Sequence, residues 1–593
     1  MKVKVAKTAG FCMGVKRAMD IVLDAAYTEK HKGATVYTDG PLIHNPQVLD
    51  LLQEKGIRTL KEGAELDKNR VVIRAHGITP SRKKEIESMG AKISDATCPH
   101  VMRVQNIIKR YSVQGYSTII IGDSGHAEVV GLLGYAEGRG YVVGSMEDID
   151  NLPPLEKVCV VAQTTQDKRL FKTTTSRLKE KYKNCEVFET ICGSTHDRQD
   201  EVINLCKSVD AMVVVGGRGS ANTTRLVKIC ESEGVPTFHI ETEAELNLEK
   251  LEDFEVVGVT AGASTPQWLL KRIVDLLASH EKQKAGRLKG WSRMAFHTSV
   301  GSCMYLGIGA VAMSYASAVL LGVEPQFSYC AIAALFLFSM HVLNNVTNRE
   351  AVALNDPFMA RLYDRHHGMF LGLGLVGLVA SYGLALAEDF YVFLMVFLSS
   401  VFFALAFRIH VLPDRVSQLL KHKSLERFAG TKEIFLGIAW ALTTALLPFI
   451  LNEPQPLAPM AVALAFAFSI AFFRAVLMDI RDIQGDRFVG KETIPIAIGR
   501  EWTKNMLVGV AVIMACLLAT SSRLDWTSNF SLWLIPCVLY ACLYLFLYHK
   551  KVIGEGLVCE AVADFNFILA GILAFLWENE LLSPLLRLVS KHV

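Results

Sequence analysis

The sequence predicts two different folding units: an α/β domain over residues 1–283 and an all-α, polytopic membrane domain of about nine helices over 298–593, joined by a basic linker at 284–297. The chain has 593 residues, which is too long for one hydrophobic core. Short β-branched runs alternate with amphipathic stretches up to about residue 285, a pattern typical of α/β domains. Beyond residue 298 apolar runs dominate, and hydrophobic residues reach 51% of the chain against 20% charged, which indicates a membrane portion.

The first unit is expected to contain mainly parallel strands. Its clearest strand candidates are VVIRAHG, YSTIIIGD, KVCVVAQTT, DAMVVVGG and FEVVGVTAG. Each run ends in glycine, polar or turn residues, and a helix-like segment follows it. Ligands usually bind at the carboxyl ends of parallel strands, where these runs carry small, hydroxyl or imidazole side chains. We therefore expect one shared polar pocket.

The second unit contains nine apolar runs that are candidate membrane-spanning helices, several of them close to the ~20 residues needed to cross a bilayer. They lie at 298–322, 325–343, 369–387, 390–408, 434–451, 457–478, 505–520, 530–548 and 562–577. Alternate loops hold most of the Lys and Arg residues, and the positive-inside rule places these loops in the cytoplasm. We expect an integral protein of the cell inner membrane, embedded in the lipid bilayer, with the first unit in the cytoplasm and the C-terminus outside. No apolar run near residue 1 suits a signal peptide.

Charge and cysteine usage narrow the possible partners. The net charge is only +3, so no general field favours nucleic acid. The thirteen cysteines lack the dense spacing of a secreted disulfide scaffold, and a reducing cytosol suits them better.

Three cysteines of the first unit are spaced almost evenly. Cys12, Cys98 and Cys192 lie in GFCMGVKRA, DATCPH and ETICGST, 86 and 94 residues apart. This spacing suggests three similar α/β units that each give one thiolate to a common centre. Three thiolates would leave one iron of a [4Fe–4S] cluster open to a substrate oxygen. From the residues alone, buried structural cysteines or a structural zinc set are the commoner alternatives.

Nine motifs of the first unit follow one another in a recognisable order. They are GFCMGVKRA, HNPQV, RAHG, DATCP, GHAEVVG, QTT, TICGSTHDRQ, GSANTTRL and AGAST. Together they resemble the 4-hydroxy-3-methylbut-2-enyl diphosphate reductase family over residues 1–280. The resemblance implies three α/β units around a central cluster. It also implies reductive removal of an allylic hydroxyl to give isopentenyl and dimethylallyl diphosphate, the last step of the methylerythritol phosphate route, with electrons from a ferredoxin or flavodoxin.

The same resemblance assigns roles to individual residues. Cys12, Cys98 and Cys192 would hold the cluster, while Glu128 would donate a proton with help from His126 and Thr164. The diphosphate would be bound by His44, His76, His126, Thr164, Ser220, Asn222, Thr223 and Ser264. A lone histidine at a strand end is more often structural and a lone loop glutamate is usually solvated, so only their conjunction supports these roles. One departure is Ala221, where the family usually has a second hydroxyl residue.

An acidic motif lies between the sixth and seventh apolar runs of the second unit. In MDIRDIQGDRFVGKETIPIAIG, the spacing of Asp479, Asp482 and Asp486 places three carboxylates on one helical face at the membrane boundary. Such a set suits Mg²⁺ that bridges to a diphosphate. The motif resembles the second aspartate motif of the UbiA-type intramembrane prenyltransferases, and that resemblance covers about 296–580.

The first aspartate motif of that superfamily, NDxxDxxxD, is damaged here. Its position holds NNVTNREAV, so Asn344 aligns, but amides stand at Asn345 and Asn348 and Val352 replaces the last aspartate. Amide oxygens add no charge to offset a cation, so Asn344 and Asn348 are weak candidate ligands and a second metal should bind poorly. Nearby compensation could come from Glu350 and Asp356. The basic residues Lys423, Arg427 and Lys432 either bind a diphosphate or only report topology.

The combined prediction is a bifunctional membrane enzyme: a reductase that makes five-carbon prenyl diphosphates, and a domain that transfers a prenyl group to an unknown acceptor. The alternative for the second unit is a non-catalytic anchor or scaffold for the reductase. A third possibility keeps the cluster but makes the first unit an iron–sulfur sensor. Glu128 and Thr164 argue against the sensor, because sensing needs no proton donor.

Overall fold

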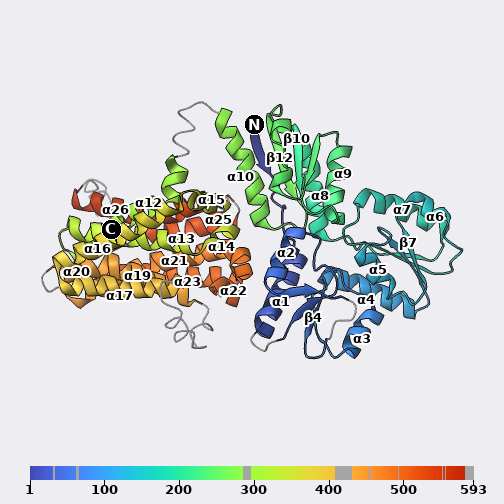
Figure 1. Ribbon diagram of the computed structural model, residues 1–593, viewed down its shortest axis with the longest axis horizontal. Helices are drawn as coiled ribbons and strands as arrows, with labels where there is room; N and C mark the ends of the chain where they lie inside the picture. The colour runs from blue at the N-terminus through green and yellow to red at the C-terminus, as the bar shows by residue number, and fades with distance from the viewer. Residues whose placement is uncertain are drawn as a thin grey trace. The chain divides into compact units, whose positions relative to one another are not determined.

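The computed structural model describes residues 1–30, 34–61, 66–284, 295–407, 430–452, 456–489, 491, 493–550, 552–553 and 556–580. The chain divides into two compact units, Met1–Ala285 and Gly286–Val593. Most of the expected linker, 285–294, lies outside the described residues. Figure 1 shows the strands confined to the first unit and the helical bundle in the second.

The first unit contains three four-stranded sheets, and every strand pair described in them is parallel. One sheet has the order β3 (Ile57–Thr59), β2 (Val36–Thr38), β4 (Arg70–Ile73), β5 (Lys92–Asp95). Another has the order β7 (Gly140–Val143), β6 (Ser117–Ile121), β8 (Val158–Ala162), β9 (Cys185–Val187). The last has the order β11 (Thr237–Ile240), β10 (Ala211–Val215), β12 (Val256–Ala261), β1 (Lys2–Val5).

The three sheets share one strand order. In each sheet the second strand of the unit lies at the edge, next to the first strand. The third strand pairs with the other side of the first, and the fourth lies beyond the third. In the last unit the N-terminal strand β1 takes the fourth place beside β12. All residues of β8 and β10 are buried, as expected for parallel strands that helices cover on both faces. The three similar α/β units predicted from the cysteine spacing are therefore confirmed.

Helices follow most strands of the first unit. They are α1 (Met13–Lys30), α2 (Pro46–Glu54), α3 (Pro80–Ser88), α4 (Pro99–Val113), α5 (Ala127–Leu133), α6 (Met146–Asp150), α7 (Lys168–Lys181), α8 (Gly193–Cys206), α9 (Ala221–Ser232) and α10 (Gln267–Lys284), with single 3₁₀ turns at Glu243–Glu245 and Glu249–Leu251. Several of these helices begin directly after the loop at the carboxyl end of a strand. Their N-termini therefore lie near the carboxyl edges of the sheets.

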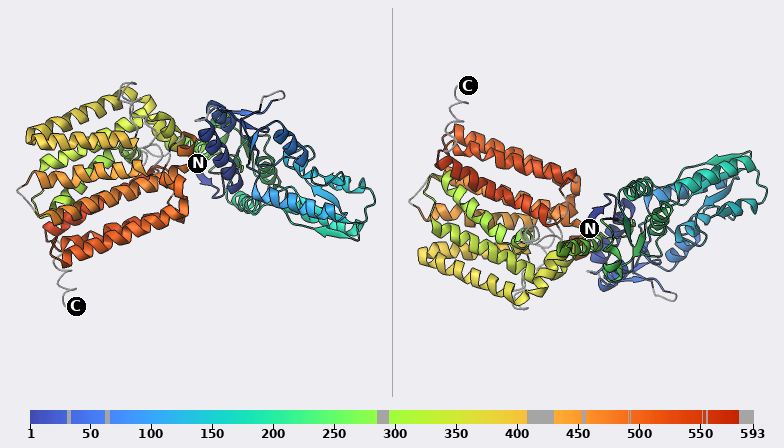
Figure 2. Two further views of the ribbon diagram at one scale, coloured as in Figure 1. Left: turned by 90° about the horizontal axis from the view of Figure 1, so that it is seen from below. Right: turned by 90° about the horizontal axis from the view of Figure 1, so that it is seen from above.

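The second unit is a bundle of apolar helices. Its elements are α12 (Met304–Leu321), α13 (Phe327–Thr347), α14 (Arg349–Asn355), α15 (Pro357–Arg365), α16 (His367–Glu388), α17 (Phe390–Phe407), α19 (Thr431–Ala441), a π-helical turn (Leu442–Leu446), α20 (Leu447–Ile450), α21 (Leu457–Val489), α22 (Ile494–Ile498), α23 (Arg500–Arg523), α24 (Phe530–Trp533), α25 (Ile535–His549) and α26 (Leu557–Glu578). Within the described residues, eight helical stretches are long and apolar enough to cross a membrane, and the apolar stretch Phe390–Ala404 is shorter. These nine correspond to the nine predicted spans. Figure 2 shows the long helices of the second unit lying side by side.

Small residues and exposed apolar faces both suit this bundle to a bilayer. A Cβ added at Gly571 would lie 2.6 Å from the Cβ of Ala312, so α12 and α26 approach closely, as packing in membranes favours. Trp440 stacks on Phe567 in the interior, with ring centroids 4.2 Å apart. By contrast, Val376 on α16 and Ile513 on α23 are 68% and 70% exposed. Such apolar surface is what lipid covers.

Candidate functional site

One cavity of the first unit brings together residues from all three sheet units. It is lined by the three cysteines and three histidines singled out in the sequence, and by Glu128, Thr164, Ser220, Asn222 and Ser264. Thr223 is not among the described lining residues; it is fully buried behind Ser220, whose hydroxyl accepts a hydrogen bond from the Thr223 N–H at 3.4 Å. The predicted shared pocket at the strand ends is therefore present.

Each cysteine of the cavity lies at the start of a helix. Cys12 directly precedes α1, while Cys98 and Cys192 are the N-cap residues of α4 and α8. The N–H of Val15 donates to Cys12 Sγ at 3.4 Å. Burial raises the pKa of Cys98 and of Cys192, and nearby backbone N–H groups of α4 and α8 oppose that rise. Three helix N-termini therefore face the sulfur atoms, where their positive ends suit an anionic group.

The sulfur spacing distinguishes a cluster from a single zinc ion. A Cβ added at Gly14 would lie 2.6 Å from Cys98 Sγ and 3.9 Å from Cys12 Sγ, so these two sulfurs flank one glycine. Among the described residues, only the three histidines have ligand atoms that all lie within 4.8 Å of one another. Sulfurs around one tetrahedral zinc would be about 3.8 Å apart, given Zn–S bonds of ~2.3 Å. The wider cysteine set fits a multi-iron cluster better.

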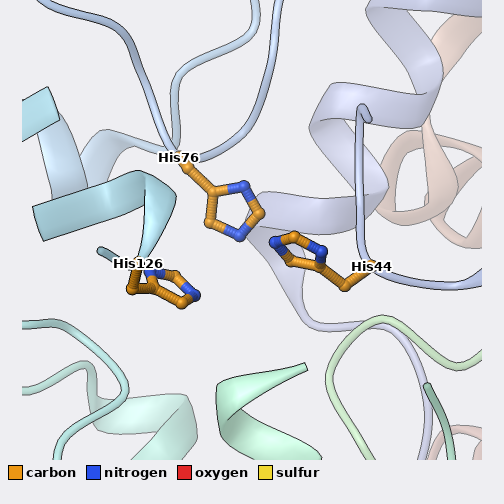
Figure 3. Close-up of side chains that lie close together, drawn as sticks. All are labelled: His44, His76 and His126. Atoms are coloured by element: carbon orange, nitrogen blue, oxygen red, sulfur yellow. The ribbon is translucent and has the colours of Figure 1, made fainter. Parts of the chain in front are cut away.

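His44, His76 and His126 form a compact group on the cavity wall (Figure 3). The centroid of the His76 ring lies 4.9 Å from that of His44 and 5.4 Å from that of His126. Burial lowers the pKa of His44 and of His76, and it lowers that of His126 to about 4; neighbouring positive charge adds to each shift. Within the described part of the chain, the buried atoms His44 Nε2 and His76 Nδ1 have no hydrogen-bond partner. Neutral rings with unsatisfied nitrogens are ready to contact a polar ligand.

The start of α9 forms another wall of the cavity. Ser220 is the N-cap of this 12-residue helix. Asn222 is buried, and its Nδ2 has no hydrogen-bond partner among the described residues. The Ser264 hydroxyl donates to the His44 carbonyl at 3.2 Å and lies 3.5 Å from Ser220 Oγ, which joins this wall to the histidine loop. Ala221 also lines the cavity without offering a hydroxyl. A helix N-terminus with amide and hydroxyl donors is suited to an anionic group.

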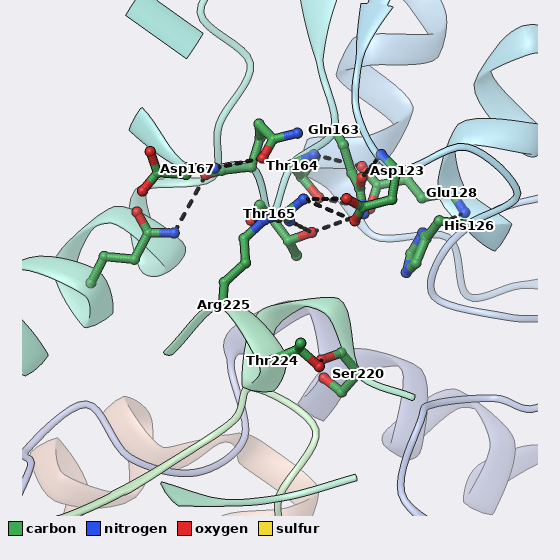
Figure 4. Close-up of polar contacts among 12 residues, drawn as sticks. Asp123, His126, Glu128, Gln163, Thr164, Thr165, Asp167, Ser220, Thr224 and Arg225 are labelled. Carbon is green, nitrogen blue, oxygen red and sulfur yellow. Dashed lines mark hydrogen bonds and ion pairs between the residues drawn. The ribbon is translucent and has the colours of Figure 1, made fainter. Parts of the chain in front are cut away.

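Glu128 is held by Thr164 at a third side of the cavity (Figure 4). The Thr164 N–H donates to Oε1 at 2.7 Å, and its hydroxyl donates to Oε2 at 2.9 Å. Glu128 is 1% exposed. Burial raises the pKa of this carboxyl, and the two hydrogen bonds from Thr164 partly oppose the rise. The arrangement places an oriented carboxyl group, whose charged form burial disfavours, in the same cavity as the cysteines and the start of α9.

The aspartates of the second unit all lie on α21. Asp479 pairs with Lys432 at 2.6 Å, and Asp482 pairs with Arg481 at 2.7 Å. Asp486 accepts a hydrogen bond from Asn355 at 3.1 Å. Among the residues that the structure describes, one buried oxygen of Asp479 and one of Asp486, both Oδ2, have no hydrogen-bond partner. Orphaned carboxylate oxygens of this kind fit a cation.

The amides of the damaged motif bond to one another and to Cys303 and Tyr363. Asn348 donates to Asn344 Oδ1 at 2.5 Å, and Asn345 donates to the Tyr363 hydroxyl at 3.3 Å. Asp356 caps α15, because its Oδ1 accepts from the N–H groups of Phe358 and Met359 at 3.1 and 3.0 Å. Glu350 is exposed in the first turn of α14. Lys423 and Arg427 lie outside the described residues.

Comparison with known proteins places the first unit. A family model described as "LytB protein" matches residues 3–278. A protein of Opitutus terrae named 4-hydroxy-3-methylbut-2-enyl diphosphate reductase is 46% identical over 286 residues, which cover 46% of this chain and 98% of that protein. The chain belongs to the 4-hydroxy-3-methylbut-2-enyl diphosphate reductase family. A relative of the same name from Caldanaerobacter subterraneus is 43% identical over 285 residues, covering 47% of this chain and 97% of that protein.

Solved structures resemble both units. A structure of (E)-4-hydroxy-3-methyl-but-2-enyl diphosphate reductase is 37% identical, with a TM-score of 0.38, and covers 47% of this chain and 100% of that chain. A UbiA homologue from Aeropyrum pernix K1 is 13% identical, with a TM-score of 0.36, and covers 46% of this chain and 98% of that chain. The model described as "UbiA prenyltransferase family" matches residues 422–555. The chain thus carries a UbiA prenyltransferase domain behind the reductase domain, and with its eight apolar stretches it is a membrane protein.

The sequence motifs did not single out two arginines of the reductase domain. Arg198, within TICGSTHDRQ, lines the cavity at 2% exposure and donates to the carbonyls of Ala261 and Gly10 at 2.6 and 3.0 Å. Arg225, within GSANTTRL, reaches Asp123 and Thr165 in loops of another sheet unit. Both lie inside quoted motifs, but an arginine on a helix reads as a surface residue until its partners are known.

Proposed function

We propose that the reductase domain, residues 1–283, converts 4-hydroxy-3-methylbut-2-enyl diphosphate into isopentenyl and dimethylallyl diphosphate, the last step of the methylerythritol phosphate route. The reaction breaks the allylic C–O bond, consumes two electrons and two protons, and releases water. The observation that carries the proposal is the buried Glu128–Thr164 pair, which shares one cavity with three cysteines and an anion-binding wall.

Cys12, Cys98 and Cys192 would hold a [4Fe–4S] cluster, with three helix N-termini offsetting its negative charge. When bound, the cluster supplies electrons one at a time and a Lewis-acidic iron. A soluble donor such as a ferredoxin or flavodoxin would provide those electrons.

The remaining residues bind, orient and protonate. The three histidines, with Ser220, Asn222 and Ser264, would donate hydrogen bonds to the diphosphate from several directions, while Thr223 holds the first turn of α9 behind them. Anchoring at this end fixes where the allylic hydroxyl lies. Glu128 would hold a proton on its carboxyl for the departing hydroxyl, and Thr164 would keep that carboxyl aimed at it.

Loss of one predicted cluster ligand tests this proposal. In anaerobic full-length protein with a reconstituted cluster and a chemical reductant, we expect 4-hydroxy-3-methylbut-2-enyl diphosphate to be consumed, followed as loss of the reductant's absorbance. Cys98→Ser should remove both turnover and the cluster's EPR signal. Cys185→Ser is the matched control, because Cys185 begins β9 and is not among the described residues that line the cavity. A wild-type protein with a full cluster and no turnover would refute the proposal.

We also propose that the UbiA domain, residues 298–593, binds one Mg²⁺ and transfers a prenyl group to an unknown acceptor. The two orphaned oxygens of Asp479 and Asp486 support one ion, which would offset the charge of the departing diphosphate. The hydrogen bond from the Asn348 amide to Asn344 Oδ1 favours the second candidate, a non-catalytic anchor. It occupies one of the candidate ligand oxygens, and neither amide carries a charge that would offset a cation.

The variant Asp486→Asn separates transferase from anchor. Asparagine keeps a side-chain oxygen for the Asn355 amide, which donates to Asp486 Oδ1 at 3.1 Å, so the bundle should persist. With geranyl diphosphate as the probe, we expect Mg²⁺ to strengthen binding to the full-length protein, and Asp486→Asn to weaken the Mg²⁺-dependent part about tenfold or more. The substitution leaves the reductase cavity unchanged, so the difference between wild type and variant at each Mg²⁺ concentration reports the UbiA domain alone. Binding that ignores Mg²⁺ would support the anchor.

The basic loops support an orientation. Arg349, Arg361 and Arg365 lie between α13 and α16, and Arg500 and Lys504 begin α23. By the positive-inside rule, we propose that these loops and the reductase domain are cytoplasmic, with the bundle in the inner membrane.

A further inference from the structure

Arg225 connects the anion-binding helix to the loops that hold the proton donor. Its side chain on α9 is 12% exposed. Its Nη2 contacts both carboxylate oxygens of Asp123, at 2.8 and 2.9 Å, and its Nη1 donates to the carbonyl and hydroxyl of Thr165, at 2.5 and 3.0 Å (Figure 4). One guanidinium thus makes four contacts to two separate loops.

These contacts cross between two sheet units. Arg225 follows β10, whereas Asp123 follows β6 and Thr165 follows β8, at sequence separations of 102 and 60 residues. A planar guanidinium suits this role, because its donors point in fixed directions and little side-chain freedom is lost per hydrogen bond. The hydrogen bonds from Arg225 to Asp123 are charge-assisted, which makes them stronger than neutral ones, although the Asp123 side chain is 50% exposed.

Both ends of the bridge lie next to the residues proposed to act on the substrate. The His126 N–H donates to the Asp123 carbonyl at 3.1 Å, which ties Asp123 to the loop that leads into Glu128. Thr165 directly follows Thr164, the residue that holds the Glu128 carboxyl. On the other side, Arg225 lies three residues after Asn222, one helical turn along α9.

Arg225 acts through these neighbours. Among the described residues that line the cavity, Arg225 does not occur, whereas Thr164 and Thr165 do. Burial is the largest influence on the pKa of Glu128 and raises it; Arg225 lowers that pKa and Asp123 raises it, so the charges of the bridge oppose each other at the carboxyl. The bridge therefore affects where Glu128 lies more than how readily it ionises.

We propose that Arg225 is a positioning residue, whose bridge to Asp123 and Thr165 fixes the proton-donor loops against the helix that anchors the substrate's diphosphate. The inference rests on the proposed reductase function. Diphosphate bound at the start of α9 and the carboxyl of Glu128 belong to different sheet units, so their separation depends on what joins those units. A misplacement of about 1 Å at a reacting group can cost ~100-fold in rate.

The test uses full-length holoenzyme with Arg225→Met, Arg225→Lys and Asp123→Asn. We expect Arg225→Met to lower kcat about 10- to 100-fold while KM changes less than about threefold, at an unchanged cluster EPR signal. The kcat of Arg225→Lys should lie between that of Arg225→Met and that of the wild type, because one ammonium reaches only one of the two loops. The double variant with Asp123→Asn and Arg225→Met should have nearly the same kcat as Arg225→Met alone, since both substitutions remove the same bridge.

Arg169→Met is the matched control, because Arg169 on α7 pairs with Glu233 at the end of α9 at 3.5 Å and also joins these two units. It is 74% exposed and is not among the described residues that line the cavity, so its loss should leave kcat unchanged. The proposal is overturned if Arg169→Met costs as much as Arg225→Met, or if Arg225→Met raises KM and leaves kcat intact. Should Arg225→Met not fold, Asp123→Asn must show the same fall in kcat at constant KM, and a wild-type kcat there overturns the proposal.

Amide hydrogen exchange separates this proposal from the reductase assignment. Exchange across residues 122–131 and 163–167 should speed up in Arg225→Met but not in Arg169→Met, whether or not the wild type turns over. An inactive wild-type holoenzyme would refute the reductase assignment, whereas unchanged exchange in Arg225→Met would refute the bridge.

Discussion

Glu128→Gln is expected to lower turnover of the full-length holoenzyme about 10²- to 10⁴-fold, the usual contribution of a positioned acid, with little change in KM. Glutamine keeps the size of the side chain and an oxygen for the Thr164 N–H, which lies 2.7 Å from Oε1. What the variant lacks is a transferable proton, because an amide does not give one up near neutral pH. The loss should therefore appear in kcat, with the cluster's EPR signal unchanged.

A buried glutamate outside the cavity provides the control. Glu29 is 1% exposed, like Glu128, and pairs with Arg70 at 2.6 Å. Glu29→Gln weakens that ion pair, so it should lower the melting temperature and leave turnover per cluster unchanged. If Glu128→Gln keeps wild-type turnover, or if both variants lose activity equally, Glu128 does not donate the proton.

The sequence predicted one shared pocket because the residues that line it stand at repeated structural positions. Cys98 and Cys192 each cap a helix that follows a strand, and Cys12 directly precedes α1 after β1. The three strands belong to three different sheet units. A spacing of about ninety residues therefore reports the repeat itself. Strand ends of parallel sheets gather at one edge, so His76 after β4 and His126 after β6 were expected to meet.

Contacts between the repeats were harder to predict. Nothing in the local sequence of Arg225 indicates that Asp123, 102 residues earlier, faces it. Such a pairing depends on how two sheet units pack, and hydrophobic periodicity reports only which face of an element is buried. The same reason hid the ion pair between Lys432 and Asp479, which joins α19 to α21 inside the bundle.

In the membrane domain, prediction from the sequence was limited in a different way. The apolar runs predicted its helices because length and hydropathy largely determine a membrane span. The short helices α14 and α15, between α13 and α16, were not predicted, because their polar and charged residues resemble an ordinary loop. Asp356 looked available to a metal in the sequence, yet its carboxylate caps α15, a use that only the local backbone reveals.

Diphosphate binding to the reductase domain should strengthen as the pH falls from 8 to 6. In the free protein, burial lowers the pKa of the three cavity histidines, that of His126 to about 4, and so disfavours their charged forms. A bound diphosphate raises these pKa values by its negative charge, so binding takes up protons. The added affinity is complete below the pKa of the free protein and is lost as the pH rises through the higher pKa of the complex. Each proton taken up changes the dissociation constant by up to about tenfold per pH unit.

Calorimetric titration of the holoenzyme with inorganic diphosphate at several pH values measures how steeply the dissociation constant changes with pH. Protonation of diphosphate itself contributes equally to every variant, so the informative quantity is the difference between the wild type and His126→Asn. Asparagine still offers a side-chain donor but takes up no proton, and it leaves His44 and His76, whose rings lie 4.9 Å apart, in place. We expect a shallower pH slope in this variant and less heat from buffer ionisation. Equal slopes in the two proteins would mean that neutral imidazoles bind the diphosphate, with the Ser220 end of α9 supplying the positive potential.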